Sequence, residues 1–261
     1  MSASRIFAVL SVAALFNAAR PLAEPVVTRH TEGTNHGLLA LRTLDGTLLA
    51  SGEQTQVLRG GQVTMHLVFR FKDGSVDEER TIFSQRGDLR LITYHLVQKG
   101  PSFPRPTDMT IDARSAEVVV RYINDHGESK TEAEHLDLPP DISNGMMNTV
   151  LKNVKADALP VTVSYVAATP KPRLVKLTIT TAGTDAFSAA GAAYKATHYV
   201  IKIGIGGLEG LLAPLLGKEP PDSHVWILTG EAPMFVQSET TRFMGAPMWR
   251  IEPASIGRPT R

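Results

Sequence analysis

The segment Gln62–Lys72 reads QVTMHLVFRFK and alternates apolar and polar side chains along nearly its whole length. The apolar positions share one parity and are Val63, Met65, Leu67, Phe69 and Phe71. Val68 is the one departure from the alternation. A period of two is typical of a β-strand with one buried face and one exposed face, so this segment predicts a strand in an open sheet.

On both sides of this segment, short turns built on glycine separate similar segments, as at Asp45-Gly46, Gly60-Gly61 and Asp73-Gly74. Such pairs favour hairpins because the tight turns need positive φ. The sequence predicts strands over Leu38–Thr43, Leu48–Leu58, Gln62–Phe71, Ser75–Phe83, Asp88–Gln98, Met109–Asp112, Glu117–Ile123, Glu128–Leu136, Val161–Ala168, Leu174–Thr181, Tyr194–Ile203, His224–Leu228, Met234–Ser238 and Met248–Ile251.

Two helical elements interrupt the strands. Two prolines precede Asp141–Asn153, and its apolar residues recur at spacings of four or eight, which predicts a short helix packed on the sheet. The leucine-rich segment Gly206–Leu216 predicts one or two further helical turns. The fold class that follows is mainly β: a strongly curved antiparallel sheet, or half-barrel meander, that clasps one or two short helices.

The composition of the 261 residues limits the function classes. Hydrophobic residues make up 43% and charged residues 20%, as in globular proteins. The formal net charge is +1, so no electrostatic feature points to nucleic acid as a partner. The chain has no cysteine, which excludes disulfides, thiolate metal sites and a lipidated cysteine anchor. We expect no cofactor.

The N-terminus has the three parts of a secretory signal peptide. Arg5 precedes the apolar run Ile6–Phe16, and small residues follow, with Ala19 and Ala23 as alternative cleavage positions. We therefore expect a signal peptide over 1–23, a flexible lead-in over 24–35, a single domain over 36–252 and a flexible tail over 253–261. The expected location is the periplasm or the exterior of a bacterium, with no membrane-spanning segment after signal removal.

Several motifs that suggest chemistry have simpler interpretations. The glycines of 204–210 do not have the spacing of a dinucleotide-binding loop, and no βαβ unit surrounds them. His126, Glu128, Glu132 and His135 are of metal-ligand types, but their spacing matches no ligand pattern, so we predict a solvated hairpin and no metal. The charge run Asp77–Arg80 is interpreted as a solvent-exposed face or a protected edge.

Histidines on two predicted strands leave two alternatives open. His95 and His198 lie among apolar residues, which favours satisfied core histidines, while catalytic histidines paired with a carboxylate are the second interpretation. No Gly-x-Ser-x-Gly nucleophile motif accompanies them. We assign no catalytic residue.

Aromatic residues are sparse at 6%, yet several fall within predicted strands. They could line a concave sheet or could belong to the core. The residues expected to line a ligand site are Tyr94, Tyr122, Tyr199, Trp226 and Trp249.

The elements around Asp222–Ile227, with Pro233, Glu239 and Gly245 after them, resemble uncharacterised exported bacterial β-proteins. The segments Phe69–Asp77 and Gln98–Pro104 add to this resemblance. It implies a fold allied to the half-barrel lipoprotein carriers of the periplasm, with an apolar concavity and no known catalytic residues.

Three function classes follow from these observations. The first is a non-enzymatic cell-envelope protein that binds or carries an apolar or lipid-like ligand. The second is a secreted hydrolase with a His–carboxylate site, which requires the two groups to converge in an open cleft. The third is an interaction module that docks through a sheet edge, which requires an unpaired strand at the surface.

Overall fold

The computed structural model describes residues 24–189, 192–204 and 220–254, so the predicted signal segment and the Gly206–Leu216 element lie outside the described residues. The elements in chain order are β1 (Asn35–Thr43), β2 (Leu48–Arg59), β3 (Gln62–Phe71), β4 (Val76–Ser84), β5 (Arg90–Lys99), β6 (Thr107–Asp112), β7 (Glu117–Ile123), β8 (Ser129–His135), α1 (Met147–Asn153), the 3-10 helix η1 (Ala156–Ala158), β9 (Val161–Ala167), β10 (Arg173–Ala189), β11 (Ala192–Ile203), β12 (Ser223–Leu228), β13 (Met234–Thr240) and β14 (Trp249–Pro253).

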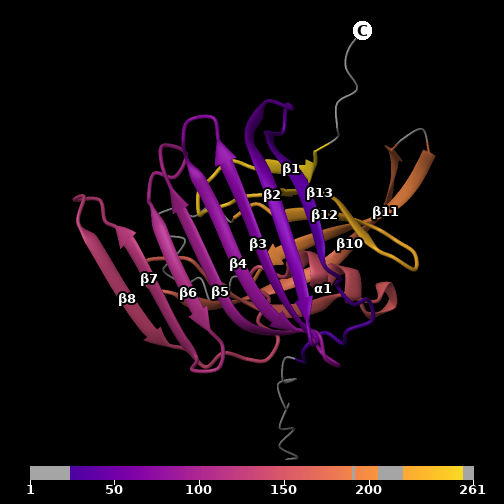
Figure 1. The fold of residues 1–261 in the computed structure, drawn as a ribbon, viewed down its shortest axis with the longest axis horizontal. Coiled ribbons are helices and arrows are strands. Elements are labelled where there is room, and N and C mark those ends of the chain that lie inside the picture. The colour runs from indigo at the N-terminus through magenta and orange to yellow at the C-terminus, as the bar shows by residue number, and fades with distance from the viewer. Residues whose placement is uncertain (1–23, 190–191, 205–219, 255–261) are drawn as a thin grey trace, which may run out of the picture.

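The 14 strands form one antiparallel sheet in the order β8-β7-β6-β5-β4-β3-β2-β1-β14-β13-β12-β11-β10-β9. Each half of the chain is a meander, and the pairing of β1 with β14 joins the halves, with Leu41 opposite Ile251. The sheet does not close, because β8 and β9 remain at its two ends. Figure 1 shows the broad wall of β1–β8 and the second set of strands turned across it. The predicted curved antiparallel sheet is confirmed.

Strands occur at all 14 predicted positions, and β10 shows the largest difference in length. It continues to Ala189 and not to Thr181, because β11 pairs with it as far as Ala189 opposite Ala192. After a register shift between Thr181 and Gly183, the pairing with β11 continues beyond the apolar part of the strand. Cross-strand pairing therefore extends β10 through residues that carry little apolar periodicity.

The predicted helix over Asp141–Asn153 is wrong at its beginning, since α1 spans only Met147–Asn153. Gly145 has a φ of 69°, a left-handed conformation that cannot continue a helix. The predicted apolar face is nevertheless buried: Ile142, Met146 and Val150 are each 2% exposed. Ile142 and Met146 of this face lie in the turn before α1, and Val150 lies in the helix.

The turn before α1 covers the free edge of β9. The backbone N–H of Ser143 donates to the carbonyl of Ser164 at 2.9 Å, and Ile142 forms a parallel bridge with Ser164. Asn144 then pairs its side-chain amide with both backbone groups of Val166. One end of the sheet is thus protected, while β8 ends the other side.

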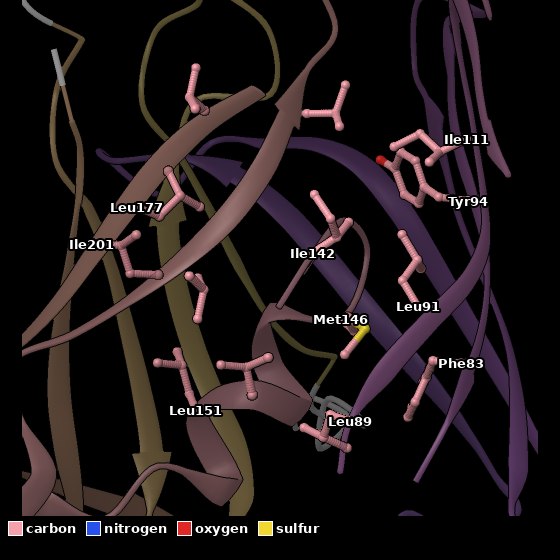
Figure 2. Packing of buried hydrophobic residues seen from close by; sticks show 14 of the residues in the cluster. Phe83, Leu89, Leu91, Tyr94, Ile111, Ile142, Met146, Leu151, Leu177 and Ile201 are labelled. Atoms are coloured by element: carbon pink, nitrogen blue, oxygen red, sulfur yellow. The ribbon is translucent and has the colours of Figure 1, made fainter. Parts of the chain in front are cut away.

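The main core lies between the two meanders. Figure 2 shows Ile142, Met146 and Leu151 between two walls, with Leu177 and Ile201 on one side and Tyr94 on the other. Phe83, Leu89, Leu91 and Ile111 extend the second wall. The segment that crosses from β8 to β9 therefore fills part of the space inside the curve.

Residues of the predicted lead-in make specific contacts with the domain. Val27 forms an antiparallel bridge with Asp88. The Asn153 side-chain oxygen accepts hydrogen bonds from the backbone N–H groups of Arg29 at 2.6 Å and His30 at 2.7 Å. Glu32 is 7% exposed. These contacts tie the segment to the residues before β5 and to the C-terminal end of α1.

Candidate functional site

A cavity of about 670 Å³ lies between the inner face of the sheet, α1 and the loop from β13 to β14. Its size falls within the range of roughly 300–1,000 Å³ that is usual for small-molecule sites. Apolar side chains from many elements line it, among them Leu39, Met65, Leu67, Leu96, Met146, Met147, Leu177, Ile201, Phe235 and Phe243. The strand that the sequence identifies most clearly, β3, supplies Met65 and Leu67.

One part of the cavity wall is ionic. Arg242, in the loop after β13, donates through Nε to Asp77 Oδ2 at 2.6 Å and through Nη2 to Glu79 Oε1. The Asp77 side chain is fully buried, and those of Glu79 and Arg242 are 12% and 14% exposed. Glu79 and Arg242 line the cavity, whereas Asp77 lies directly behind Arg242. The guanidinium therefore holds the loop against β4.

Neutral donors complete this cluster. Gln98 Nε2 donates to Asp77 Oδ1 at 3.3 Å and to the carbonyl of Arg242 at 2.9 Å. The Tyr94 hydroxyl donates to Glu79 Oε2 at 3.1 Å. Each oxygen of the two carboxylates thus accepts a hydrogen bond, which is the arrangement that favours the ionised forms.

Burial and charge shift the pKa values in this cluster. Burial raises the pKa of Asp77, and the charge of Arg242 opposes that rise. Burial, together with the Glu79 charge, raises the pKa of Tyr94 well above its usual value and that of Tyr165 to about 12. Burial would lower the pKa of Arg242, but Asp77 and Glu79 outweigh it and raise that pKa. Both tyrosines therefore stay hydroxyl donors at neutral pH.

A second ionic pair lines the cavity next to α1. Lys152 Nζ lies 2.9 Å from Glu32 Oε1 and 3.2 Å from Oε2. Thr149 donates to Oε1 at 3.0 Å, and Gln56 donates to Oε2 at 3.3 Å. This pair is internally balanced in charge, so it supplies polarity without excess charge.

The five aromatic residues expected to line a site lie in different places. Tyr94 lines the cavity. Tyr199 is 5% exposed in the main core, and Tyr122 packs against that core. Trp249 belongs to a second buried cluster with Phe71 and Phe103, whose rings lie 5.5 Å and 6.3 Å from it.

Trp226 stacks on His198 with ring centroids 4.3 Å apart. Its indole N–H donates to Asp185 Oδ2 at 2.6 Å, and His198 Nδ1 lies 3.4 Å from the same oxygen. His198 Nε2 is 2.9 Å from His224 Nδ1. Burial, followed by the charge of His224, lowers the pKa of His198. Ser223, the neighbour of His224 in sequence, lines the cavity instead, since adjacent strand residues face opposite sides.

The prediction that His95 is a core residue is wrong. The register shift between Ile82 and Phe83 leaves Ile92 as an extra residue in β5, so Leu91 and Tyr94 both face inward. His95 follows Tyr94 and therefore faces outward. Its side chain is 40% exposed, and Nε2 lies 3.1 Å from Asp108 Oδ1. His95 and Asp108 are within hydrogen-bonding reach, in a partly exposed position.

The interpretation of Asp77–Arg80 as a solvent face is wrong for half of its residues. Glu78 and Arg80 face outward and contact each other, whereas Asp77 and Glu79 face inward. One sequence signal is the parity that Asp77 and Glu79 share with the buried Phe83. The sequence does not reveal their partner, because Arg242 lies more than 160 residues away along the chain.

Over the ranges that the structure describes, no group of three or more His, Asp or Glu side chains is arranged to hold a metal ion. Within the same ranges, no helix has the length and apolarity needed to cross a membrane.

No family model matches the sequence, and a search of curated proteins finds no match. Among solved structures, the chain is similar to a beta-barrel-like protein of a domain of unknown function, DUF1849, from Brucella abortus. The sequences are 9% identical and the TM-score is 0.46, over 89% of this chain and 98% of that chain.

Proposed function

We propose that this protein binds an apolar or lipid-like molecule in the cavity inside its curved sheet and does so without catalysis. The observation that carries the proposal is the cavity of about 670 Å³ itself, whose wall is mainly apolar and includes a few polar groups. This combination is what small-molecule sites share: apolar area for affinity and fixed polar groups for orientation.

The proposal includes the cell envelope as the location. It rests on the N-terminal Arg5, the apolar run Ile6–Phe16 and the small residues after it. The same proposal includes a carrier role similar to that of the periplasmic lipoprotein carriers. N-terminal sequencing of the protein from the envelope fraction of an expressing bacterium tests the location. We expect a chain that begins after Ala19 or Ala23, and a cytosolic chain that retains Met1 would refute export.

The experiment on binding compares the wild type with Leu67→Trp. Leu67 lines the cavity, so a larger ring there occupies ligand space. Arg70→Trp is the matched control because Arg70 lies on the same strand and is exposed on the outer face. Lipids that copurify from the envelope are identified by native mass spectrometry and by extraction. We expect bound lipid in the wild type and in Arg70→Trp, and its loss in Leu67→Trp. An empty wild type, or equal loading of all three proteins, would refute the proposal.

A hydrolase is the second candidate, and two observed pairs favour it: His95 with Asp108, and His198 with Asp185. A histidine beside a carboxylate can act as a general base. Chromogenic esters of short and long acyl chains test this function. Turnover that disappears in His95→Ala or His198→Ala would support it, and no turnover by the wild type would remove it.

A further inference from the structure

We infer that the ligand carries a positively charged amine group, which lies beside Glu79 while the hydrocarbon part occupies the apolar wall of the cavity. The inference rests on the proposed function and names the chemical class of ligand for the same site.

The first step is the balance of charge around the cavity. Among the described residues that line it, the charged side chains are Glu32, Lys152, Glu79 and Arg242. Glu32 and Lys152 neutralise each other. Arg242 faces Glu79 and also Asp77, which is fully buried behind it. Two carboxylates therefore share one guanidinium, and one negative charge is left without a partner in this part of the wall.

The second step is the protonation of the two carboxylates. Asp77 accepts from Gln98 on one oxygen and from Arg242 on the other. Glu79 accepts from Arg242 and from Tyr94. The Arg242 N–H groups and the Gln98 amide N–H can only donate, so their contacts favour the ionised forms of Asp77 and Glu79, whereas the Tyr94 hydroxyl can donate or accept. These contacts oppose burial, which raises the pKa of Asp77. A buried excess charge is costly unless a charge of opposite sign pairs with it.

The third step is the accessibility of the negative group. Glu79 lines the cavity and is 12% exposed, so a ligand group can reach it, whereas Asp77 is sealed. Each carboxylate oxygen has a second lone pair for a further donor. Tyr94 and Tyr165 line the same cavity, and the charges of Glu79 and Arg242 are close enough to act on both rings. Aromatic rings next to a carboxylate favour an ammonium group.

An anionic head group lacks an equivalent partner in the described part of the cavity. Arg242 is committed to two carboxylates, and Lys152 contacts both oxygens of Glu32. A carboxylate or phosphate would compete with these acid groups for the positive charges of Arg242 and Lys152. Such a ligand adds negative charge where negative charge is already in excess.

Calorimetric titration of the full-length mature protein at neutral pH tests the inference with three probes of one chain length: decylamine, decanoate and decyl maltoside. The head group alone differs between them. We expect decylamine to bind the wild type about tenfold more tightly than decyl maltoside, and decanoate to bind most weakly. Added salt should reduce the preference, because the discriminating contact is ionic.

Glu79→Gln should reduce the preference for decylamine to about twofold or less, since it removes the unbalanced charge and keeps the side-chain shape. Glu78→Gln is the matched control: Glu78 is the adjacent residue, and its carboxylate contacts His66 and Arg80 on the outer face. The control should retain the full preference. If Glu79→Gln does not fold, the ranking of the three probes on the wild type decides the question.

The outcomes separate the two proposals. Equal affinities for the three probes, or tightest binding of decanoate, would overturn the amine inference and leave the apolar site standing. Failure of all three probes to bind would remove the proposed function as well. A preference that persists in Glu79→Gln and disappears in Glu78→Gln would place the amine on the outer face and refute the inference.

Discussion

At the scale of single residues, Arg242 determines what β4 can carry on its inner face. Asp77 and Glu79 lie in the interior because one guanidinium reaches both of them, at the cost of holding three charged groups away from water. The Phe69 ring lies 6.0 Å from the guanidinium carbon, on the adjacent strand. The cluster thus fastens the loop after β13 to the strands that carry the cavity wall.

Removal of the guanidinium should be strongly destabilising. Arg242→Met leaves two carboxylates buried without a cation, and we expect the free energy of unfolding to fall by about 3–5 kcal/mol. In an Asp77→Asn background the same change should cost less, with a coupling of about 0.5–3 kcal/mol, because one of the stranded charges is gone. Urea denaturation of the four proteins measures the cycle. Additive effects would show that Arg242 and Asp77 do not act as a pair.

The raised pKa of Asp77 makes stability depend on pH in a defined direction. Its folded pKa lies above 3.8, so the folded chain holds this proton more tightly than the unfolded chain does. The contribution is fully present below the unfolded pKa and is lost as pH rises through the folded pKa. Asp77→Asn lacks this loss, so its stability relative to the wild type should increase as the pH rises above about 4. A constant difference over that range would contradict the assignment.

At the scale of elements, residues 143–146, directly before α1, have three structural roles. Ser143 and Asn144 bond to the edge of β9, Gly145 reverses the chain, and Met146 enters the core. A continuous helix from Asp141 would bury the same apolar residues but would leave the backbone groups of β9 without these partners. The turn is therefore favoured over the helix that periodicity predicts.

Gly145 should not tolerate a side chain. A Cβ there would lie 2.0 Å from Thr81 Oγ1 and 2.8 Å from the Tyr94 ring. Gly127 has a similar φ of 77° with nothing within 4 Å, so Gly127→Ala reports the backbone strain alone. We expect Gly145→Ala to lower the free energy of unfolding by about 1–3 kcal/mol more than Gly127→Ala does. Equal losses in denaturant titrations would mean that the cavity wall adjusts freely.

At the scale of the whole molecule, the sheet has two ends that are protected in different ways. Residues 141–144 cover β9, while β8 ends the other side of the sheet. Lys130, Glu132 and Glu134 of β8 pair with Tyr122, Val120 and Val118, so they share the inner face with apolar neighbours. Charges that point inward on an edge strand hinder the addition of another strand. This edge is also where docking through a strand would occur.

Replacing these charges should promote self-association. Lys130→Val with Glu132→Val removes two of the three charges from the inner face of β8, and we expect dimers or larger species by sedimentation at concentrations where the wild type does not associate. Thr131→Val with Ala133→Val is the control, since both residues lie on the other face of the same strand. Identical sedimentation of the two double variants would show that edge charge does not govern association.

Much of the fold could be predicted from the sequence, and less of the site. Alternation and glycine turns predict each strand from β1 to β14, because period and turn chemistry are local properties. Which residues line the cavity depends on contacts between segments that are far apart in the sequence. Tyr94 and Trp249 both lie on strands and both are aromatic, yet only pairing and the bulge in β5 decide that Tyr94 lines the cavity while Trp249 packs with Phe71 and Phe103.

Alternation, glycine turns and composition are enough to establish that β3 has one apolar face, that the chain is a series of antiparallel hairpins and that thiol chemistry is absent. The contacts of Arg242 with Asp77 and Glu79, and the pairing of β1 with β14 that joins the two meanders, become visible only in the folded chain. A charged side chain can be buried when it pairs with an opposite charge, and that partner can lie anywhere in the sequence. Strand periodicity, in contrast, depends only on residues that are close in sequence.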